Sequence, residues 1–383
     1  QALMVSTASR VGTGNIAGIS TAICLGGSGA VFWMWLTAIL GSASAFIEST
    51  LAQIYKHKAK DGSSYGGPAY YIQAALKKRW IGVLFAVVLI LTYMGGFNLV
   101  ASFNIADSFR VYSFFNPEWT PLIVGAILAV VFALAVFGGS KKISQITEVL
   151  VPVMGIFYLA VSLFIILKHY QLVPVMFTSI FNNAFDVQAI FGGFAGSCVM
   201  HGIKRGLFSN EAGMGSTPHA HAVAKVQYPA QQGLMGIVSV FIDTFVVLNM
   251  TALVIFVTGA LDGTTTGIAL TQKAFSTGLG AFGIKFVAIC LLFFAFSTIV
   301  GWYFFGEQNV KYLFGTRGVT PYRVVVMCFI VMGSLLQVNL VWELADMFNG
   351  LMAFPNLIAL IGLAKVVSKA LDEFEQANLA DNK

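Results

Sequence analysis

The chain has 383 residues, of which 57% are hydrophobic and only 10% are charged, and its mean hydropathy is +0.82. A soluble domain carries about 25% charged residues, so this composition excludes a water-soluble fold, a disordered chain and a disulfide-rich secreted scaffold. The net charge of +6 does not indicate nucleic-acid binding, because the basic residues lie in loops between apolar runs. Four isolated cysteines form no CxxC motif, so neither a zinc site nor a disulfide framework is predicted.

Apolar runs of about 20 residues predict membrane-spanning helices rather than barrel strands. We therefore predict an all-α, polytopic protein of about ten transmembrane helices in a lipid bilayer. The predicted spans are 1–25, 31–55, 81–109, 120–138, 146–167, 186–202, 229–259, 281–306, 321–340 and 342–366. Their order suggests two halves of five spans each, 1–180 and 181–366, followed by a polar tail, 367–383.

The basic residues orient these spans. With the N-terminus in the cytoplasm, seventeen of the 22 lysines and arginines lie on the cytoplasmic side, four lie on the outer side, and Arg10 lies inside a span. This bias is a strong positive-inside signal. It predicts a multi-pass protein of the prokaryotic inner membrane with both ends of the chain, including the tail, in the cytoplasm. Because the chain starts without an initiator methionine, we expect further residues upstream of Gln1.

Two glycine clusters predict interrupted helices. Span one contains Gly12, Gly14 and Gly18 around Asn15, and span six contains the run 191–197, Phe-Gly-Gly-Phe-Ala-Gly-Ser. Glycine loosens a helix, and a broken backbone survives in lipid only where its freed N–H and C=O groups find partners. Broken helices at matching positions in two halves indicate a transporter site. The alternative is that these glycines only let helices pack closely.

Six sequence blocks carry a resemblance to a known family. They are residues 11–18, 26–35, 66–71, 205–216, 297–302 and 349–356. Together they resemble the sodium:alanine/glycine symporter family over nearly the whole chain. The resemblance implies a leucine-transporter-like inverted repeat of five plus five helices and sodium-coupled symport of small neutral amino acids, alanine and glycine, by alternating access. One departure is Ala101 in span three, where the family usually has glutamine, so the substrate preference can differ.

The resemblance also implies a sodium site between spans one and eight. Backbone carbonyls of Ala8, Val11 and Phe294 and the hydroxyls of Ser297 and Thr298 would coordinate the ion. The chemistry agrees, since sodium prefers oxygen ligands and the two hydroxyls interrupt a phenylalanine-rich run. The alternative is that each hydroxyl only bonds to a carbonyl one turn earlier in its own helix.

For the substrate, we assign Trp302 to the pocket wall, one helical turn after Thr298. A bulky ring there leaves room only for a small side chain; the alternative is a tryptophan at the membrane interface. The carboxylate would meet N–H groups in span one, and the ammonium would meet carbonyls of the span-six break. The full predicted substrate set is Thr13, Gly14, Asn15, Ile16, Ser102, Phe103, Phe191, Gly192, Gly193, Phe194 and Trp302.

Ionisable residues inside spans are candidates for function. Arg10 would form a cytoplasmic gating pair with Glu211 or Glu48, or would extend to the interface. Asp243 would bind a second ion, carry a proton or be a hydrogen-bonded structural acid. Asp346 with Asn349 would belong to an outer gate. We expect Lys204, Arg205, Asn210, Glu211, His219 and His221 in a polar cytoplasmic loop, with no metal site there because a third ligand is missing.

Competing classes have weaker support. An ion channel would need a repeated filter of carbonyl or carboxylate rings, and the sequence has none. An enzyme is not predicted, because no HExxH, GxSxG or phosphate-loop motif occurs. The nearest rival is a proton-coupled amino-acid transporter, for which Asp243 would carry the proton.

Overall fold

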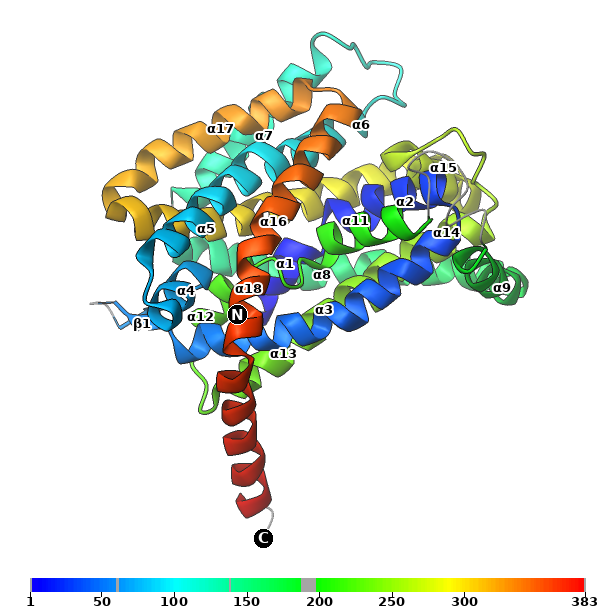
Figure 1. The fold of residues 1–383 in the computed structure, drawn as a ribbon. Coiled ribbons are helices and arrows are strands. Elements are labelled where there is room, and N and C mark those ends of the chain that lie inside the picture. The colour runs from blue at the N-terminus through cyan, green and yellow to red at the C-terminus, as the bar shows by residue number, and fades with distance from the viewer. Residues whose placement is uncertain (1, 60–61, 138, 187–197, 382–383) are drawn as a thin grey trace.

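The structure is a computed structural model that describes residues 2–59, 62–137, 139–186 and 198–381. It is built almost entirely from helices, and its one described sheet is the short hairpin of β1 (His57–Lys58) and β2 (Ser64–Tyr65). The prediction of an all-α protein is confirmed. Figure 1 shows the helices crossing one another in a single bundle, with β1 and α15 at opposite ends.

The first half of the chain forms spans one to five. Span one is split into α1 (Ala2–Arg10), the π-helical stretch η1 (Gly14–Gly18) and α2 (Ile19–Gly26). The remaining elements are α3 (Gly29–Ile54), α4 (Pro68–Leu76), α5 (Arg79–Thr92), η2 (Tyr93–Phe97), α6 (Asn98–Asp107), α7 (Thr120–Val136), α8 (Gly139–Lys168), η3 (Tyr170–Leu172) and α9 (Val173–Ala184).

The second half begins with a segment that is only partly described. Its elements are α11 (Cys198–Asn210), α12 (Pro218–Ala222), α13 (Pro229–Phe241), η4 (Ile242–Leu248), α14 (Asn249–Val257), α15 (Gly267–Leu279), α16 (Ala281–Phe314), η5 (Gly315–Gly318), α17 (Val319–Leu335) and α18 (Val338–Asp381). Every one of the ten predicted spans therefore contains helix in the structure.

Fewer continuous stretches than ten are long and apolar enough to cross a membrane. The described residues contain five, or six if the bent pair of α8 and α9 is one span. The difference has simple causes: α16 and α17 follow each other within one stretch of 55 residues, α7 is short, and span one is broken. Large apolar side chains on outer faces, such as Ile156 on α8 (69% exposed) and Ile361 on α18 (78%), suit contact with lipid.

Two helices differ from the predicted boundaries. The chain turns by 81° after α8, and α9 follows where we expected only a connection. It lies along the start of α3, where Trp33 Nε1 donates a hydrogen bond to the carbonyl of Ala184 over 3.2 Å. The predicted polar tail, 367–383, is not separate from span ten, since α18 continues to Asp381 and its last turns project from the bundle (Figure 1).

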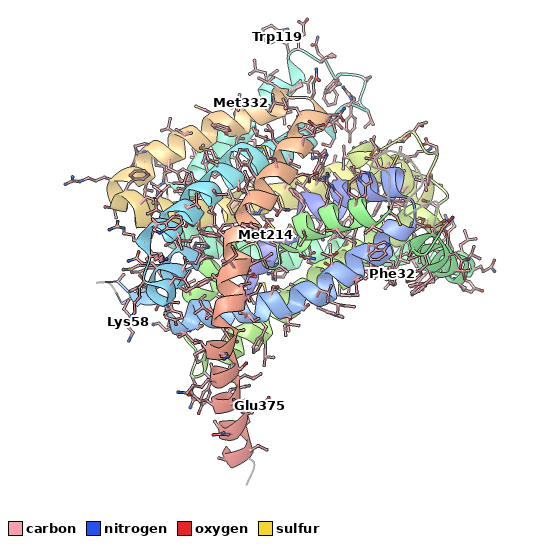
Figure 2. All side chains as sticks on the ribbon, in the orientation of Figure 1. Phe32, Lys58, Trp119, Met214, Met332 and Glu375 are labelled. Atoms are coloured by element: carbon pink, nitrogen blue, oxygen red, sulfur yellow. The ribbon has the colours of Figure 1, made fainter. Side chains whose placement is uncertain are left out.

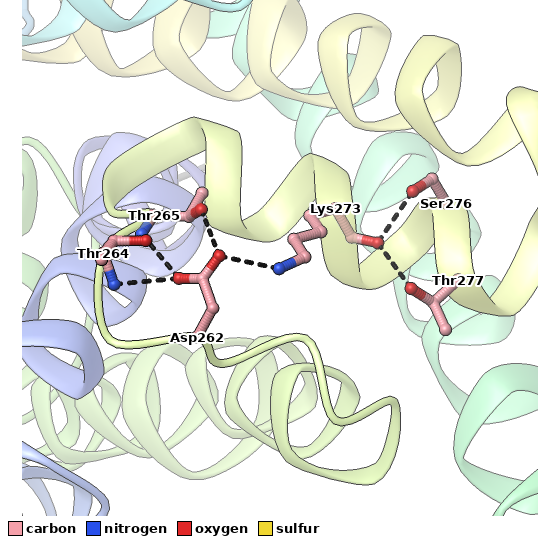
Figure 3. A network of polar contacts seen from close by, with 6 residues as sticks. All are labelled: Asp262, Thr264, Thr265, Lys273, Ser276 and Thr277. Atoms are coloured by element: carbon pink, nitrogen blue, oxygen red, sulfur yellow. Dashed lines mark hydrogen bonds and ion pairs between the residues drawn. The ribbon is translucent and has the colours of Figure 1, made fainter.

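The two ends of the bundle can be named by what lies there. The N-terminal face carries the start of α1, the β1–β2 hairpin and the end of α16. The α15 face carries the loop before α15, where Asp262 accepts hydrogen bonds from Thr264 N and Thr265 N, at 2.9 and 2.7 Å, and from the Lys273 ammonium, at 2.8 Å (Figure 3). Lys273 and then the Thr265 hydroxyl hold the pKa of Asp262 below its usual range.

Candidate functional site

The break in span one follows the prediction. Helix α1 ends at Arg10, and the freed groups are satisfied from outside the helix. The Asn15 side chain accepts a hydrogen bond from Gly12 N over 2.8 Å, and the Thr251 hydroxyl donates to the carbonyl of Asn15 over 2.6 Å. Thr271 on α15 donates to the carbonyl of Ile16 over 2.8 Å. Two neighbouring elements, α14 and α15, therefore supply partners to the backbone of this segment.

The predicted sodium ligands lie together where α1 crosses α16. The Thr298 hydroxyl lies 2.7 Å from the carbonyl oxygen of Phe294 and 3.2 Å from that of Ala8, so it joins the two helices. The Ser297 hydroxyl donates to the same Phe294 carbonyl over 2.9 Å. Both hydroxyls thus make the local bonds of the alternative interpretation, and Thr298 makes the contact between helices as well.

Gly12 allows the two helices that form this oxygen cluster to approach each other. A Cβ atom at position 12 would lie 2.0 Å from Thr298 Oγ1, so only glycine allows α1 and α16 to approach this closely. Val11, beside it, is 2% exposed, and its N–H donates to Thr7 O over 2.8 Å. Neutral oxygens from two helices in a dry site suit a sodium ion.

Asp243 lies behind the span-one break, fully buried. Its carboxylate accepts hydrogen bonds from Asn15 Nδ2 at 2.7 Å, from the Ser209 hydroxyl at 3.1 Å and from the Thr244 hydroxyl at 2.9 Å. The acid therefore links span one, span six and span seven. These contacts are those of a hydrogen-bonded structural acid, which is one of the three interpretations of Asp243. The other two, an ion ligand and a proton carrier, remain predictions.

The second predicted break is not tested by the structure, and a further interruption follows it along the chain. Residues 191–197, including Phe191, Gly192, Gly193 and Phe194, fall outside the described residues. Beyond them, helix α11 ends at Asn210, and a turn over 211–217 leads to α12. Gly213 and Gly215 have φ of 79° and 82°, values that favour glycine.

The 211–217 turn is not a solvated loop. Asn210, Glu211, His219 and His221 are all 1% exposed or less, so the predicted polar cytoplasmic loop is wrong. Figure 2 places Met214, at the centre of the turn, in the middle of the bundle. Its glycines stand between a polar helix end and Pro218, and the glycine argument used for span one could have found this break.

Glu48 on α3 fixes the turn. Its carboxylate accepts hydrogen bonds from Gly213 N at 3.4 Å, from Gly215 N at 3.1 Å and from Asn356 Nδ2 on α18 at 3.2 Å. The Thr217 hydroxyl adds a further bond at 3.4 Å. A buried carboxylate thus supplies the partners that the broken backbone needs.

Arg10 is buried, with 1% exposure, so it does not extend to the interface as one alternative proposed. Its guanidinium forms no ion pair with a carboxylate of any described residue. It donates instead to Ser239 and, over 3.0 Å, to Thr217, which in turn donates to Glu48. The expected direct pair with Glu48 or Glu211 is therefore replaced by a link through a hydroxyl.

Trp302 lies against the 211–217 turn. It is 1% exposed, so the alternative of a tryptophan at the membrane interface is wrong. Its Nε1–H donates a hydrogen bond to Oε1 of Glu211. Its ring lies 5.0 Å from Phe97, 5.9 Å from Tyr93 and 6.1 Å from Phe208 between centroids. Aromatic rings from spans three, six and eight therefore enclose this side of the site.

Span three contributes other residues than we expected. Tyr93 and Phe97 face Trp302, whereas Ser102 lies against α17, where a Cβ on Gly333 would be 2.2 Å from the Ser102 hydroxyl. Phe103 is only half-buried. The structure therefore does not bring Ser102 to the site, and the spacing of Tyr93 and Phe97, four residues apart, is the signal that was missed.

Charged residues close the α15 face. One guanidinium nitrogen of Arg205 on α11 lies 2.6 and 2.5 Å from the two carboxylate oxygens of Asp346 on α18. Lys204 approaches the same carboxylate at 3.4 Å, and Arg205 also covers the ring of Trp342 at 4.2 Å. The prediction that Arg205 lies in a cytoplasmic loop is therefore wrong, because Arg205 is buried within α11 and paired with α18.

A cavity of about 1230 Å³ lies at the N-terminal face. Its lining comes from the start of α1, the hairpin, the segment that follows α12, α13 and the end of α16, with Tyr65, Gln232 and Lys311 among its polar residues. The two faces thus differ: a charged cluster joins two helices at one, and the other is hollowed.

Comparison with known proteins identifies the family. A profile of the sodium:alanine symporter family matches residues 1–383. The chain belongs to this family. It is 44% identical to the probable sodium/glutamine symporter GlnT of Bacillus subtilis (strain 168), over 99% of this chain and 79% of GlnT. It is 40% identical to the sodium/alanine symporter AgcS of Methanococcus maripaludis, over 98% of this chain and 84% of AgcS.

The fold of this sodium:alanine symporter family member is that of the leucine-transporter group. The crystal structure of MhsT in complex with L-phenylalanine matches it with a TM-score of 0.61 and 14% identity, covering 96% of this chain and 97% of MhsT. At that identity the likeness concerns the fold alone. The family makes the protein a sodium-coupled secondary transporter of amino acids, in which sodium is a transported ion.

Proposed function

We propose that this symporter carries a small neutral amino acid, alanine or glycine, together with sodium across the plasma membrane. The observation that supports this most directly is the close approach of the two interrupted segments, where a Cβ on Gly14 would lie 3.0 Å from Ser209 Cα. They lie beside Trp302, which is bonded to Glu211, and beside the oxygen cluster of Ala8, Phe294 and Thr298. A sodium ion among these oxygens would join α1 to α16 and so stabilise one arrangement of the two helices. Coupling follows if sodium binds the two states of the transporter with different affinity.

The substrate lies, in this proposal, between the span-one break and Trp302. Backbone N–H groups near Gly14, Asn15 and Ile16 meet the carboxylate, because the start of a helix segment attracts negative charge. The rings of Trp302, Phe97 and Phe208 leave a short side chain as the best fit. Ala101 lies one turn from Phe97 on the same helix face, and its small side chain gives extra room where the family usually has glutamine.

The two faces support alternating access. If the N-terminus is cytoplasmic, as the basic residues predict, the cavity faces inward and the Arg205–Asp346 pair closes the outer side. The protein then has the inward-facing form of a multi-pass protein of the prokaryotic inner membrane. The halves 1–180 and 181–366 would be the repeats that rearrange around the site.

Two alternatives keep specific support. GlnT is named a probable sodium/glutamine symporter, so glutamine is the second candidate substrate. Proton coupling is the second candidate mechanism, because Asp243 is fully buried and its partners Asn15, Ser209 and Thr244 are all uncharged.

Uptake into proteoliposomes tests all of these. Labelled alanine, glycine and glutamine are each offered under an imposed sodium gradient and then under an imposed proton gradient. We expect accumulation of alanine and glycine with sodium alone, at rates well above glutamine. Accumulation driven by protons alone would contradict sodium coupling, and faster glutamine uptake would reassign the substrate. Replacing Asp243 by asparagine should leave sodium-driven uptake measurable, whereas a proton carrier at this position would make the variant insensitive to pH.

A further inference from the structure

Three polar side chains near Trp302 lack partners. Glu211 Oε2, the Ser216 hydroxyl and the Tyr93 hydroxyl are buried, and none of them has a partner at normal hydrogen-bond distance and angle among the described residues. The three residues have 0% exposure. Ser216 makes only a weaker side-chain interaction with each of the other two, and the Glu211 carboxylate interacts electrostatically with the Tyr93 phenol. The three therefore face one small region.

Such a group is costly without a ligand. A buried polar atom left without a partner costs about 1–3 kcal/mol, and more if it is charged, so nearly all buried polar atoms in proteins are paired. The other carboxylate oxygen of Glu211 is already held by Trp302. The backbone of Glu211 has φ of 52°, a conformation that a side-chain-bearing residue keeps only where the surroundings enforce it.

A carboxylate oxygen beside two hydroxyls suits a cation with several donors. All three atoms can accept hydrogen bonds, and one belongs to a carboxylate. The nearest internal cation is Arg10, but its terminal nitrogens are bonded to Ser239, Gly236 and Thr217. A primary ammonium group has three N–H donors and one positive charge, which matches three acceptors including one acid.

We infer that Glu211, Ser216 and Tyr93 bind the ammonium group of the transported amino acid. This inference rests on the proposed function, and it replaces the carbonyls of residues 191–193 that we expected to do so. Glu211 then has two tasks on one carboxylate: Oε1 orients the pocket wall through Trp302, and Oε2 binds the ammonium. The site selects α-amino acids over compounds that carry a carboxylate alone.

Two inhibitors of labelled alanine uptake test this in the full chain reconstituted in liposomes. Alanine carries both charged groups, and propionate carries the carboxylate without the amine. We expect each of three variants to raise the alanine concentration needed for half-maximal inhibition by about 10-fold to 100-fold, the range for a lost bond to a charged group. The variants are Ser216→Ala, Tyr93→Phe and Glu211→Gln. Inhibition by propionate should stay unchanged. The control is Tyr322→Phe, because the Tyr322 hydroxyl is also buried without a partner in the described residues but lies away from the site.

The remaining outcomes overturn the inference. If inhibition by alanine and inhibition by propionate both become weaker, the variants damage the pocket as a whole. If the sodium concentration for half-maximal uptake rises while alanine at saturating sodium binds normally, the cation is sodium. If Ser216→Ala and Tyr93→Phe change nothing, water satisfies the three atoms. The unmodified protein separates this from the proposed function, which fails only if that protein shows no sodium-driven uptake of an amino acid.

Discussion

Gly12 and Thr298 approach so closely that a Cβ atom on residue 12 would lie 2.0 Å from the Thr298 hydroxyl oxygen. That oxygen in turn lies 3.2 Å from the carbonyl of Ala8 and 2.7 Å from the carbonyl of Phe294. The position of α1 against α16, and with it the oxygen cluster proposed for sodium, therefore depends on the absence of a side chain at position 12.

Gly12→Ala should raise the sodium concentration needed for half-maximal alanine uptake. The added methyl group must push Thr298 or α1 aside, and overpacking of this kind costs about 1–3 kcal/mol, or at least about fivefold in affinity. Gly350→Ala is the control, because nothing lies within 4 Å of its added Cβ. Equal sodium dependence in the two variants would show that the ion binds elsewhere.

Removing both hydroxyls tests the same site by its chemistry. In the double variant Ser297→Ala, Thr298→Ala, the cluster loses two of its oxygens, while the carbonyls of Ala8 and Phe294 remain. We expect sodium-dependent uptake of alanine to be lost, with insertion into the membrane intact, since each lost hydroxyl removes an oxygen ligand from a hard cation. Normal sodium dependence in transport measurements would remove both residues from the site.

Trp302→Ala should widen the substrate range. The variant removes a ring that lies among Tyr93, Phe97 and Phe208, and it frees a cavity that a longer apolar side chain can fill. We expect leucine to compete with labelled alanine in the variant and not in the unmodified protein. Trp119→Ala is the matched control, since Trp119 is 60% exposed in a loop. Unchanged selectivity would take Trp302 out of the pocket.

Much of the fold could be predicted because a helix that crosses a lipid bilayer needs a long apolar run, which is visible in the sequence. Apolar runs of membrane length identified every span, and the glycines around Asn15 identified the break in span one. Ser297 and Thr298 were assigned from the family resemblance, with which two hydroxyls in an apolar run agree, and their role as sodium ligands stays a prediction. Helix α9 was missed because a helix joining two spans needs no run of membrane length.

The buried turn at 211–217 was missed for a physical reason. The charged and polar residues around Glu211 are typical of a loop in water. Only the tertiary structure shows that Glu48 and Arg10, from other helices, contact the same turn. The same holds for Arg205, whose positive charge predicts a cytoplasmic loop. The structure shows that it pairs instead with Asp346, which lies 141 residues later in the chain. Long-range pairing of buried charges is not visible in local composition.

Asp262 predicts how the α15 face responds to acid. Lys273 and Thr265 lower the pKa of Asp262 in the folded protein relative to the unfolded value of about 3.9. The contribution of this network to the loop is therefore present above pH of about 4 and is lost as the pH falls through the lower, folded pKa. Asp262→Asn should leave the shape of the pH profile of alanine uptake between pH 5 and pH 8 unchanged. A profile that shifts in the variant would mean that Asp262 titrates within this range.

The pair of Arg205 and Asp346 predicts a gate on the α15 face. Asp346→Asn leaves a guanidinium that is 5% exposed without its anion, and breaking a buried pair in this way costs about 3–5 kcal/mol. Because the pair joins α11 to α18 in this closed arrangement, the variant should populate the form that is open on the α15 face.

Cysteine labelling measures that shift. Asn349→Cys places a thiol one turn beyond Asp346, in a background without the four native cysteines. A maleimide that cannot cross the membrane should label it at least about tenfold faster when Asp346→Asn is added. Lys204→Gln is the matched control, because Lys204 is 44% exposed and its contact at 3.4 Å should contribute at most about 1 kcal/mol. Equal labelling in all variants would show that other contacts close this face and that the ion pair only neutralises Arg205.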